Sequence, residues 1–305
     1  MTNDSAATIA AYGERARAAS RRLAAATAAE KSAALEAMAA AVDADRDLLL
    51  ERNALDMEAA KDEGVGGALL DRQLLTQDRI DGIVGGLRKV AGLPDPVGSE
   101  TGGWRLYNGV RLQRVRVPLG VVAVIYEARP NVTADAAGLC VKSGNAALLR
   151  GSSFTLQSNL AVGAALRRGL EEAGMPADAV QVIEDVTREG AQALMTAEGW
   201  VDLLVPRGGP GLVGAVAAEA TVPVVIDGAG NCHVYVDADA DLDDAEAITI
   251  NAKVQRPGVC NAAEKLLVHR DIAGEFLPRI AAALRTSGVE VRGDAAARAI
   301  VPDLG

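Results

Sequence analysis

The sequence predicts an α/β protein built on a mostly parallel β-sheet. Half of the 305 residues are hydrophobic but only 3% are aromatic, so the core must be largely aliphatic. From residue 115 onward, short runs rich in Val, Leu and Ile alternate with longer alanine-rich segments. This alternation is typical of βαβ units, whose right-handed crossovers make neighbouring strands parallel. The length is sufficient for two domains with a substantial core.

The N-terminal third is expected to be helical. Residues 8–62 are dense in alanine and nearly free of Gly and Pro, and apolar side chains recur at helical spacing. Residues 71–90 form a second predicted helical stretch, which ends in the turn-rich sequence GLPDPVGSETGG.

The middle of the chain is expected to form a Rossmann-like sheet. Residues 115–126 (VRVPLGVVAVIY) predict a strand, a Pro-Leu-Gly break and then a buried strand. Further strands are predicted at 146–149, 180–183, 201–205 and 222–226, and helices at 153–173, 188–197 and 211–220. Parallel sheets bind ligands at the carboxyl ends of their strands. We therefore expect a cofactor-binding domain with N-terminal helices over residues 1–230.

A second α/β domain is expected over residues 231–305. Its predicted strands are 233–236, 265–269 and 289–291, and its predicted helices end near residue 253 and cover 272–285. The irregular sequence VQRPGVCN lies between them. The last residues, AIVPDLG, show no closing element, so this domain is expected to be truncated at its C-terminus.

Charge and cysteine content exclude several classes of protein. The net charge of −10 and the pI of about 4.9 give no basic footprint for nucleic acid. Three cysteines without CxxC spacing indicate a reducing compartment, and no signal peptide or membrane-length apolar run is visible. We therefore expect a cytoplasmic protein with no membrane segment. Neither histidine lies in a ligand-spaced cluster, so no metal site is expected.

The three cysteines differ as candidate nucleophiles. Cys140 lies in the apolar helical sequence AAGLCVKSG and is expected to be buried. Cys232 precedes His233, but adjacent side chains on a strand point to opposite faces and cannot form a dyad. Cys260 lies in irregular backbone near Lys253, and neighbouring cations lower the pKa of a thiol. These features alone are equally compatible with a catalytic Cys260 and with a small packed residue.

Two further motifs also leave both interpretations open. Gly209–Gly214 formally matches GxGxxG directly after a predicted strand, which is the context for a phosphate at a helix N-terminus. A glycine-rich turn without a ligand fits the same pattern, although Arg207 beside it is a suitable phosphate ligand. Glu127 and Arg129 follow a buried strand, and they fit a binding site and a structural ion pair equally well.

Several segments together resemble one family. They are VPLGVVAVIYEARPNVTADAAGLCVKSGNAALLRG, VDLLVPRGG, GNCHVYVD, NAKVQRPGVCNAAEKLLVH and, near the N-terminus, LLDRQLLTQDRI. These segments are similar to the gamma-glutamyl phosphate reductase (glutamate-5-semialdehyde dehydrogenase) family of the aldehyde dehydrogenase superfamily. The resemblance covers essentially the whole chain. It implies an aldehyde dehydrogenase-like fold and NADPH-dependent reduction of L-glutamyl 5-phosphate to glutamate 5-semialdehyde and phosphate, the second step of proline synthesis.

The resemblance also implies roles for individual residues. It makes Cys260 the nucleophile that forms a thioester, and the developing oxyanion then needs preorganised donors. The Cys260 backbone N–H is the first expected donor and Asn131 is the candidate for the second. Substrate phosphate and carboxylate need cations, for which the candidates are Arg129, Arg207 and Arg256.

The remaining implied contacts are with the cofactor and the substrate. Arg150 matches the position that contacts the cofactor ribose, and an Arg there suits the 2′-phosphate of NADP. The expected cofactor-binding residues are Arg150, Arg207, Gly208 and Gly209, and Asn261 is expected on the substrate side. Further implied partners are a functional link to glutamate 5-kinase and, for the full-length family, a homo-oligomer.

Two departures from the family pattern bear on activity. Ile226 stands where many relatives carry the general-base Glu, which fits a reductase that does not hydrolyse its thioester. The family continues well past Gly305, so we expect this chain to be unstable or weakly active. The alternatives are a CoA-acylating aldehyde dehydrogenase and an inactive relative that binds nucleotide without turnover.

Overall fold

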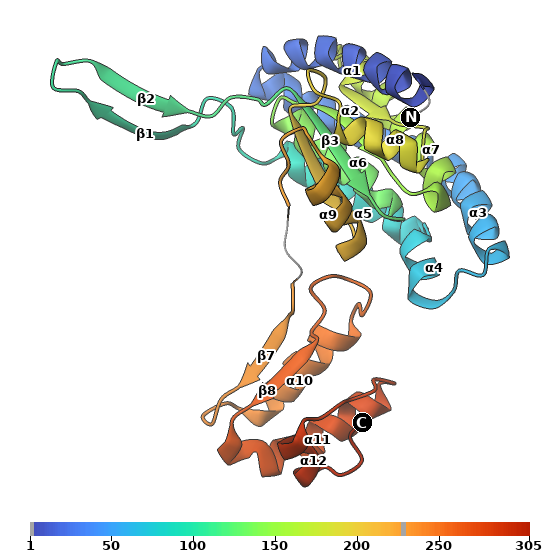
Figure 1. Ribbon diagram of the computed structural model, residues 1–305, viewed down its shortest axis with the longest axis vertical. Helices are drawn as coiled ribbons and strands as arrows, with labels where there is room; N and C mark the ends of the chain where they lie inside the picture. Colours follow the sequence, from blue (N-terminus) through green and yellow to red (C-terminus); the bar gives the residue numbers. More distant parts are fainter. Residues whose placement is uncertain (1–2, 227–229) are drawn as a thin grey trace. The chain divides into compact units, whose positions relative to one another are not determined.

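The computed structural model describes residues 3–226 and 230–305, apart from the side chains of Asn3 and Ala68 (Figure 1). The chain divides into two compact units, Met1–Asp227 and Gly228–Gly305. This division falls close to the domain boundary expected after residue 230.

Unit 1 is built on a four-stranded sheet in the order β5-β4-β3-β6. Its strands are β3 (Val121–Tyr126), β4 (Ala146–Arg150), β5 (Val180–Val182) and β6 (Leu203–Arg207). All three strand pairs are parallel, and β3 is buried along its whole length. The predicted parallel α/β fold is therefore confirmed.

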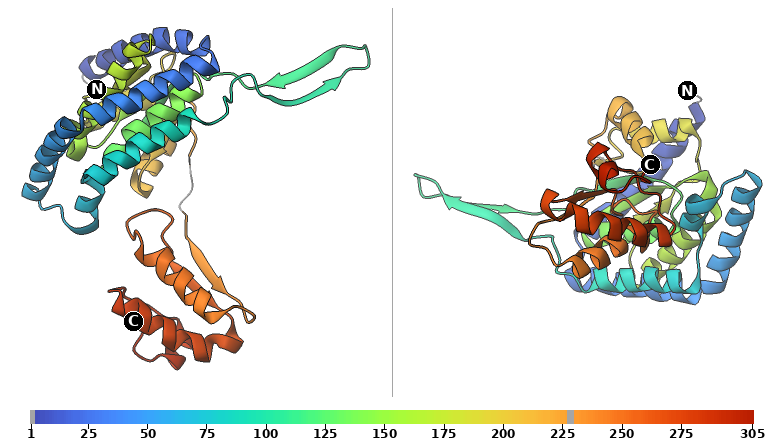
Figure 2. Two further views of the ribbon diagram at one scale, coloured as in Figure 1. Left: turned by 180° about the vertical axis from the view of Figure 1, so that it is seen from behind. Right: turned by 90° about the horizontal axis from the view of Figure 1, so that it is seen from below.

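Helices cover both faces of this sheet (Figure 2). Alternate residues of β3 belong to two separate hydrophobic cores because successive side chains of a strand point to opposite faces. One core receives α6 and α7, with α2, α3 and α5 outside them, and the other receives α1, α8 and α9. The bounds are α1 Asn3–Ala24, α2 Ala28–Ala44, α3 Arg46–Asp62, α4 Gly67–Gln73, α5 Gln77–Ala91, α6 Pro130–Lys142, α7 Leu156–Glu172, α8 Arg188–Met195 and α9 Pro210–Glu219.

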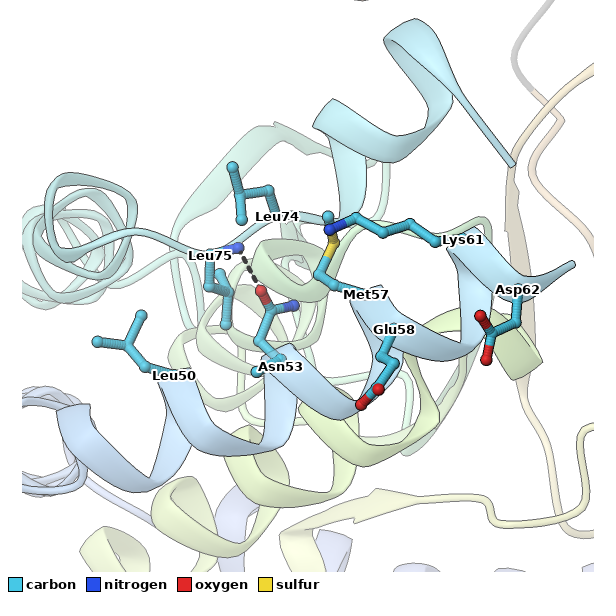
Figure 3. Close-up of a pocket in the computed structure, with 9 residues that line it drawn as sticks. Leu50, Asn53, Met57, Glu58, Lys61, Asp62, Leu74 and Leu75 are labelled. Carbon is cyan, nitrogen blue, oxygen red and sulfur yellow. Dashed lines mark hydrogen bonds between the residues drawn. The ribbon is translucent and has the colours of Figure 1, made fainter. Parts of the chain in front are cut away.

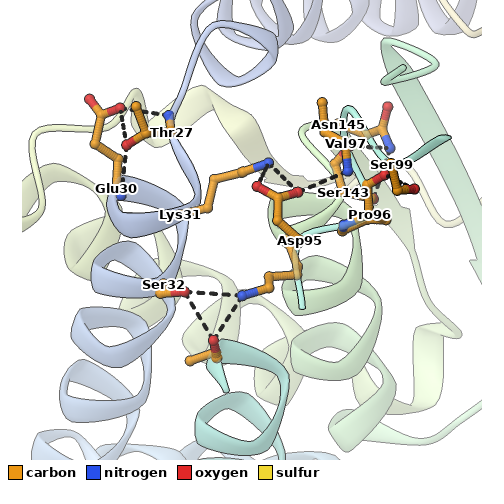
Figure 4. A network of polar contacts seen from close by, with 12 residues as sticks. Thr27, Glu30, Lys31, Ser32, Asp95, Pro96, Val97, Ser99, Ser143 and Asn145 are labelled. Atoms are coloured by element: carbon orange, nitrogen blue, oxygen red, sulfur yellow. Dashed lines mark hydrogen bonds and ion pairs between the residues drawn. The ribbon is translucent and has the colours of Figure 1, made fainter. Parts of the chain in front are cut away.

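The N-terminal helical stretch consists of separate helices, not the continuous segments expected from the sequence. Thr27 begins α2 with a capping box, in which its hydroxyl accepts from the Glu30 backbone N–H and its own N–H donates to the Glu30 carboxylate (Figure 4). The pattern Thr-x-x-Glu is visible in the sequence and is the signal that the prediction missed. Further breaks lie at Asp45, between α2 and α3, and at residues 74–76, between α4 and α5.

Two buried lysines hold the loop between α5 and the next strand (Figure 4). Lys31, which is 1% exposed, donates to both carboxylate oxygens of Asp95 at 2.8 and 2.6 Å. Lys142 donates to the Ser32 hydroxyl and to the Ala91 carbonyl. The Lys31 ammonium holds the pKa of Asp95 below its usual value, although desolvation acts in the opposite direction. These contacts join α2, α6 and the loop after α5.

A β-hairpin that the sequence reading did not predict extends from unit 1 (Figure 1). Strand β1 (Glu100–Arg105) pairs antiparallel with β2 (Arg111–Val115), and every residue of both strands is exposed. No alternation marks these strands because neither face is buried in unit 1. Gly102 and Gly103 also lower the β-propensity of this segment.

The predicted strand over residues 222–226 is wrong. The segment follows β6 and makes two backbone hydrogen bonds to Leu204, but it forms only one isolated bridge, Leu204–Val224. Pro223 lacks an N–H group and cannot donate to a longer ladder. Among the β-branched side chains that suggested a strand, Val222 is buried but Val225 and Ile226 are exposed.

Unit 2 contains a parallel strand pair and three helices. Its elements are β7 (His233–Val236), α10 (Leu242–Val254), β8 (Lys265–Val268), α11 (Arg270–Thr286) and α12 (Ala295–Ile300). Phe276 and Ile280 of α11 lie in its core with Val236 of β7.

One expectation for the end of unit 2 is wrong. Residues 289–291 are not a strand, because the Val289 N–H bonds to the last turn of α11 and the Val291 carbonyl accepts from Gly305. After the short helix α12, Leu304 packs with Ala281 and Val301.

Candidate active site

The strand order places a topological switch point at the carboxyl ends of β3 and β6. The chain passes from β3 to β4 and β5 on one side and then returns to β6 on the other, which makes this the switch point where α/β sheets bind ligands. Tyr126 pairs with Arg207 at this edge. Four predicted site residues therefore share one edge of the sheet: Arg129, Arg207, Gly208 and Gly209.

Glu127 connects the two strand ends. Its carboxylate Oε1 accepts a hydrogen bond of 2.5 Å from the Gly209 N–H, and its own N–H donates to the Arg207 carbonyl. A Cβ at Gly208 would lie 2.9 Å from the Glu127 Cγ, and one at Gly209 would lie 3.2 Å from Oε1. The glycine pair thus makes room for the carboxylate at the start of α9, where the helix dipole favours a negative charge.

The other glycines of the GxGxxG match have no such role. A Cβ built on Gly211 or Gly214 meets no described atom within 4 Å. The predicted strand–turn–helix context is present, since β6 ends at Arg207 and α9 begins at Pro210. The residues that matter sterically are therefore Gly208 and Gly209, the glycine pair of the sequence VDLLVPRGG.

Arg150 lies at the end of β4 and turns towards the loop before α8. Its Nη2 donates to the carbonyls of Val186 and Thr187 at 2.6 and 2.8 Å. Its Nε is buried and has no hydrogen-bond partner among the described residues. Burial lowers the pKa of Arg150, while Asp185 acts in the opposite direction.

Asn131, the candidate second oxyanion donor, is an exposed residue in the first turn of α6. Its Nδ2 donates to the Asp135 carboxylate at 2.9 Å. Desolvation raises the pKa of Asp135, against the effect of this hydrogen bond. The amide thus already has an acceptor one helical turn away.

A buried hydrogen-bonded chain fixes α6 beneath this edge. The Tyr126 hydroxyl lies 2.8 Å from the Thr133 hydroxyl, which donates to Asn159 Oδ1 at 3.1 Å, and Asn159 Nδ2 donates to Thr155. Because Thr133 donates onward, Tyr126 is the donor to Thr133. Desolvation raises the pKa of Tyr126. The chain links β3, α6 and α7 directly under the residues that lead into the site.

Cys260 lies in unit 2 on an exposed turn. The turn is held by local backbone bonds from Val259 to Arg256 and from Ala262 to Val259. Arg256 and Asn261, the predicted substrate-side residues, are exposed on either side of Cys260. The predicted irregular backbone is confirmed, because no helix or strand covers residues 255–264.

The other two cysteines differ from Cys260 in burial. Cys140 is buried in α6, as expected, and desolvation raises the pKa of its thiol to about 12. Cys232 is half-buried, and its Sγ lies 3.6 Å from the carbonyl oxygen of Cys260. The sequence showed Cys232 beside His233 but gave no indication that its thiol reaches the Cys260 turn.

A groove on α3 contains none of the predicted site residues (Figure 3). Leu50, Met57 and Leu74 line it, together with Asn53. Asn53 accepts from the Leu75 N–H at 2.7 Å and donates to the Gln73 carbonyl and the Ser158 hydroxyl. Asn53 therefore attaches the α4–α5 link to α3 and α7.

Two classes of site are not found in the described part of the chain. No group of three or more His, Cys, Asp or Glu side chains there could hold a metal ion. Among the described helices, none is both long and apolar enough to cross a bilayer.

The aldehyde dehydrogenase family matches residues 1–298, so the chain belongs to this family. Its curated relatives include gamma-glutamyl phosphate reductases. The protein of that name from Moorella thermoacetica is 55% identical over 241 residues, which are 79% of this chain and 58% of that protein. The one from Syntrophomonas wolfei is 49% identical over 292 residues, which are 96% of this chain and 70% of that protein.

Solved structures agree with this assignment. Gamma-glutamyl phosphate reductase from Thermotoga maritima is 46% identical with a TM-score of 0.87, covering 97% of this chain and 72% of that one. The Saccharomyces cerevisiae enzyme of that name is 30% identical with a TM-score of 0.66, covering 96% and 73%. The chain thus spans between 58% and 73% of the length of these four relatives.

Proposed function

We propose that this chain carries the cofactor unit and the nucleophile of an NADPH-dependent reductase. The reductase converts L-glutamyl 5-phosphate to L-glutamate 5-semialdehyde and phosphate. The observation that carries the proposal is Cys260, an exposed thiol on irregular backbone in a chain about half identical to reductases of this name. Loops held by a rigid scaffold are where catalytic residues concentrate.

Cys260 acts as the nucleophile in this proposal. Its thiolate attacks the acyl phosphate, phosphate leaves, and a thioester remains on Sγ. After reduction the thiohemiacetal on Cys260 collapses and releases the aldehyde. The Cys260 backbone N–H is the first proposed oxyanion donor and Asn131 the second, in which case its bond to Asp135 must open or be shared.

Charged groups of the substrate are assigned to Arg129, Arg207 and Arg256, and Asn261 to a polar contact beside the thiol. Planar guanidinium groups suit phosphate and carboxylate because they donate two parallel hydrogen bonds. Ile226 supplies no base for water attack on the thioester, and reduction needs none. The side chain of Ile226 is 40% exposed.

NADPH is the proposed cofactor, and when bound it would supply the hydride for reduction. The cofactor is assigned to the switch point of the sheet, where Arg150 and Arg207 lie at the carboxyl ends of β4 and β6 and supply cations of the kind that phosphate groups need. Arg150 has an unpaired buried Nε, which supports a role for its guanidinium in holding a 2′-phosphate.

A second copy of the chain is the proposed assembly partner. The β1–β2 hairpin exposes Trp104, Leu112 and Val115 in an isolated two-stranded ribbon. Two-stranded hairpins are marginal in water unless something packs on them. A functional link to the kinase that makes glutamyl 5-phosphate is proposed from the substrate alone.

The reaction is tested in the oxidative direction. NADP reduction is followed with glutamate 5-semialdehyde, with and without phosphate, in the wild type and in Cys260→Ala. We expect phosphate-dependent turnover that falls at least about a thousandfold in Cys260→Ala and remains in the matched control Cys140→Ala. Turnover that requires CoA in place of phosphate, or that survives Cys260→Ala, would refute the proposal.

A further inference from the structure

Cys232 and Cys260 meet within unit 2 although 28 residues separate them. The Cys232 thiol donates to the Cys260 carbonyl oxygen at 3.6 Å, and that oxygen is two covalent bonds from the Cα that carries the Cys260 side chain. Disulfide-linked Cα atoms lie roughly 4.4–6.8 Å apart, a spacing compatible with this contact.

The two cysteines are held in different ways. The Cys232 carbonyl accepts from the backbone N–H groups of Glu264 and Lys265, which fixes it at the start of the β7–β8 pair. The Cys260 turn is held by short-range bonds within residues 256–262. A shift of this turn, together with rotation of the Cys260 side chain, therefore brings the Cys260 thiol to the Cys232 thiol, whose backbone is fixed.

Solvent access separates this pair from the third cysteine. Cys260 is exposed and Cys232 is half-buried, whereas Cys140 is buried in the other unit. Susceptibility to oxidation follows exposure and thiolate character. Cys260 is therefore the thiol that reacts first with a soluble oxidant, and Cys232 is placed to react with the oxidised Cys260.

We propose that Cys232 is a resolving cysteine, which converts oxidised Cys260 into an intramolecular Cys232–Cys260 disulfide. A hydroperoxide is the oxidant: the Cys260 thiolate attacks its terminal oxygen, the O–O bond breaks, and Cys260 becomes a sulfenic acid. The Cys232 sulfur then attacks the Cys260 sulfur, and the hydroxyl leaves as water. With hydrogen peroxide, two thiols lose two electrons and two hydrogens, and two waters form.

The consequence for activity rests on the proposed function. A disulfide occupies the Cys260 sulfur, so the reductase is inactive until a thiol reduces it. The same bond protects Cys260 from the sulfinic acid, which thiols do not reduce. Formation of the disulfide therefore inactivates the nucleophile reversibly and prevents its permanent loss as the sulfinic acid.

Peptide mass spectrometry after hydrogen peroxide treatment tests the bond without any activity measurement. Tryptic peptides 208–253 and 254–265 each contain one of the two cysteines. In the wild type we expect these peptides linked with the loss of two hydrogens, and Cys140 still reduced. In Cys232→Ser we expect no link, and sulfinic acid at Cys260 forming roughly tenfold faster. Cys140→Ala, the matched control, should behave like the wild type.

Three results would overturn the proposal. They are equal rates of sulfinic acid formation in the wild type and Cys232→Ser, a disulfide found only between two chains, and Cys260 that stays reduced while other thiols oxidise. If the linked peptides form but no reductase activity exists before oxidation, the disulfide stands and the proposed function fails. Recovery of activity with dithiothreitol in the wild type, but not in Cys232→Ser, supports both.

Discussion

The Glu127 side chain determines how closely the loop after β3 and the loop after β6 approach each other. Its carboxylate meets the Gly209 N–H at the start of α9, and Gly208 packs against its Cγ. The Glu127 carboxylate caps α9, which follows another strand end, and the sequence did not suggest this contact. The glycine pair and the glutamate therefore act as one steric unit.

Substitution of Gly208 tests this unit. Gly208→Ala places a Cβ 2.9 Å from the Glu127 Cγ and the Leu212 Cδ2, so we expect the free energy of unfolding to fall by about 1–3 kcal/mol. Gly211→Ala is the matched control, expected to be neutral or slightly stabilising because its Cβ meets nothing within 4 Å. Urea unfolding measures both, and a Glu127→Ala background should reduce the cost of Gly208→Ala. Equal effects at the two glycines would contradict this account.

Helix ends and buried ions determine the elements of unit 1. The Thr27–Glu30 capping box ends the link after α1 and begins α2, which divides a segment that is uniformly rich in alanine. The Lys31–Asp95 pair then fixes the loop that leads from α5 to the hairpin. Both features involve polar side chains whose role depends on partners, not on helix propensity.

The capping box predicts a pH dependence. Hydrogen bonds from the Thr27 backbone and from Arg22 lower the pKa of Glu30 from 4.5 to about 2. The folded value lies below the unfolded one, so this contribution to stability is fully present above about pH 4.5. It is lost as the pH falls towards 2. We expect the Glu30 carboxyl to titrate near 2 by NMR and closer to its ordinary value in Arg22→Gln, and a midpoint unchanged by that substitution would contradict this assignment.

Removal of one partner of the buried ion pair is expected to be costly. Lys31 is 1% exposed and the Asp95 side chain is 15% exposed, so Lys31→Met leaves a partly buried carboxylate without its cation. We expect a loss of about 3–5 kcal/mol, with partial recovery in the double variant Lys31→Met/Asp95→Leu. Arg88→Met, which removes a surface pair with Glu36, is the control and should cost at most about 1 kcal/mol. A small effect of Lys31→Met in chemical denaturation would show that the pair is not important for stability.

At the scale of the whole molecule, the exposed β1–β2 hairpin is the feature that bears on assembly. It combines apolar side chains with Arg105, Arg111, Arg114 and Arg116 in a chain whose net charge is −10. A basic, partly apolar ribbon on an acidic protein is complementary to the acidic surface of another copy. This complementarity supports the proposed homo-oligomer.

The hairpin prediction is tested by light scattering after size exclusion. Trp104 pairs with Leu112 across the strands, and the double variant Trp104→Ser/Leu112→Ser removes this apolar pair. We expect a lower molar mass than the wild type with thermal unfolding of unit 1 shifted by no more than about 2 °C, since no core residue changes. Leu55→Ser, which alters another exposed leucine, is the control. An unchanged mass would exclude the hairpin as the assembly surface.

Much of the fold could be predicted because its signals are local. The buried strands β3 and β4, the helices between strands and the irregular turn with Cys260 follow from apolar runs, breakers and alternation. The failures have local causes as well. Residues 222–226 and 289–291 are rich in Val and Ile, but β-branched side chains also occur where a segment is only packed. The hairpin was not predicted because both of its faces are exposed, so its sequence lacks a clear alternation of apolar and polar residues.

The sequence by itself determined the parallel α/β class, the burial of Cys140 and the irregular backbone around Cys260, since each depends on residues close in the chain. The exposure of Cys260 was found only in the structure. Only the tertiary structure decided which distant groups meet. Glu127 and Gly209 are 82 residues apart, and Cys232 and Cys260 are 28 apart. The sheet order brings the first pair together and the β7–β8 pairing brings the second. Contacts of this kind depend on strand order and register, which no local pattern of residue types contains.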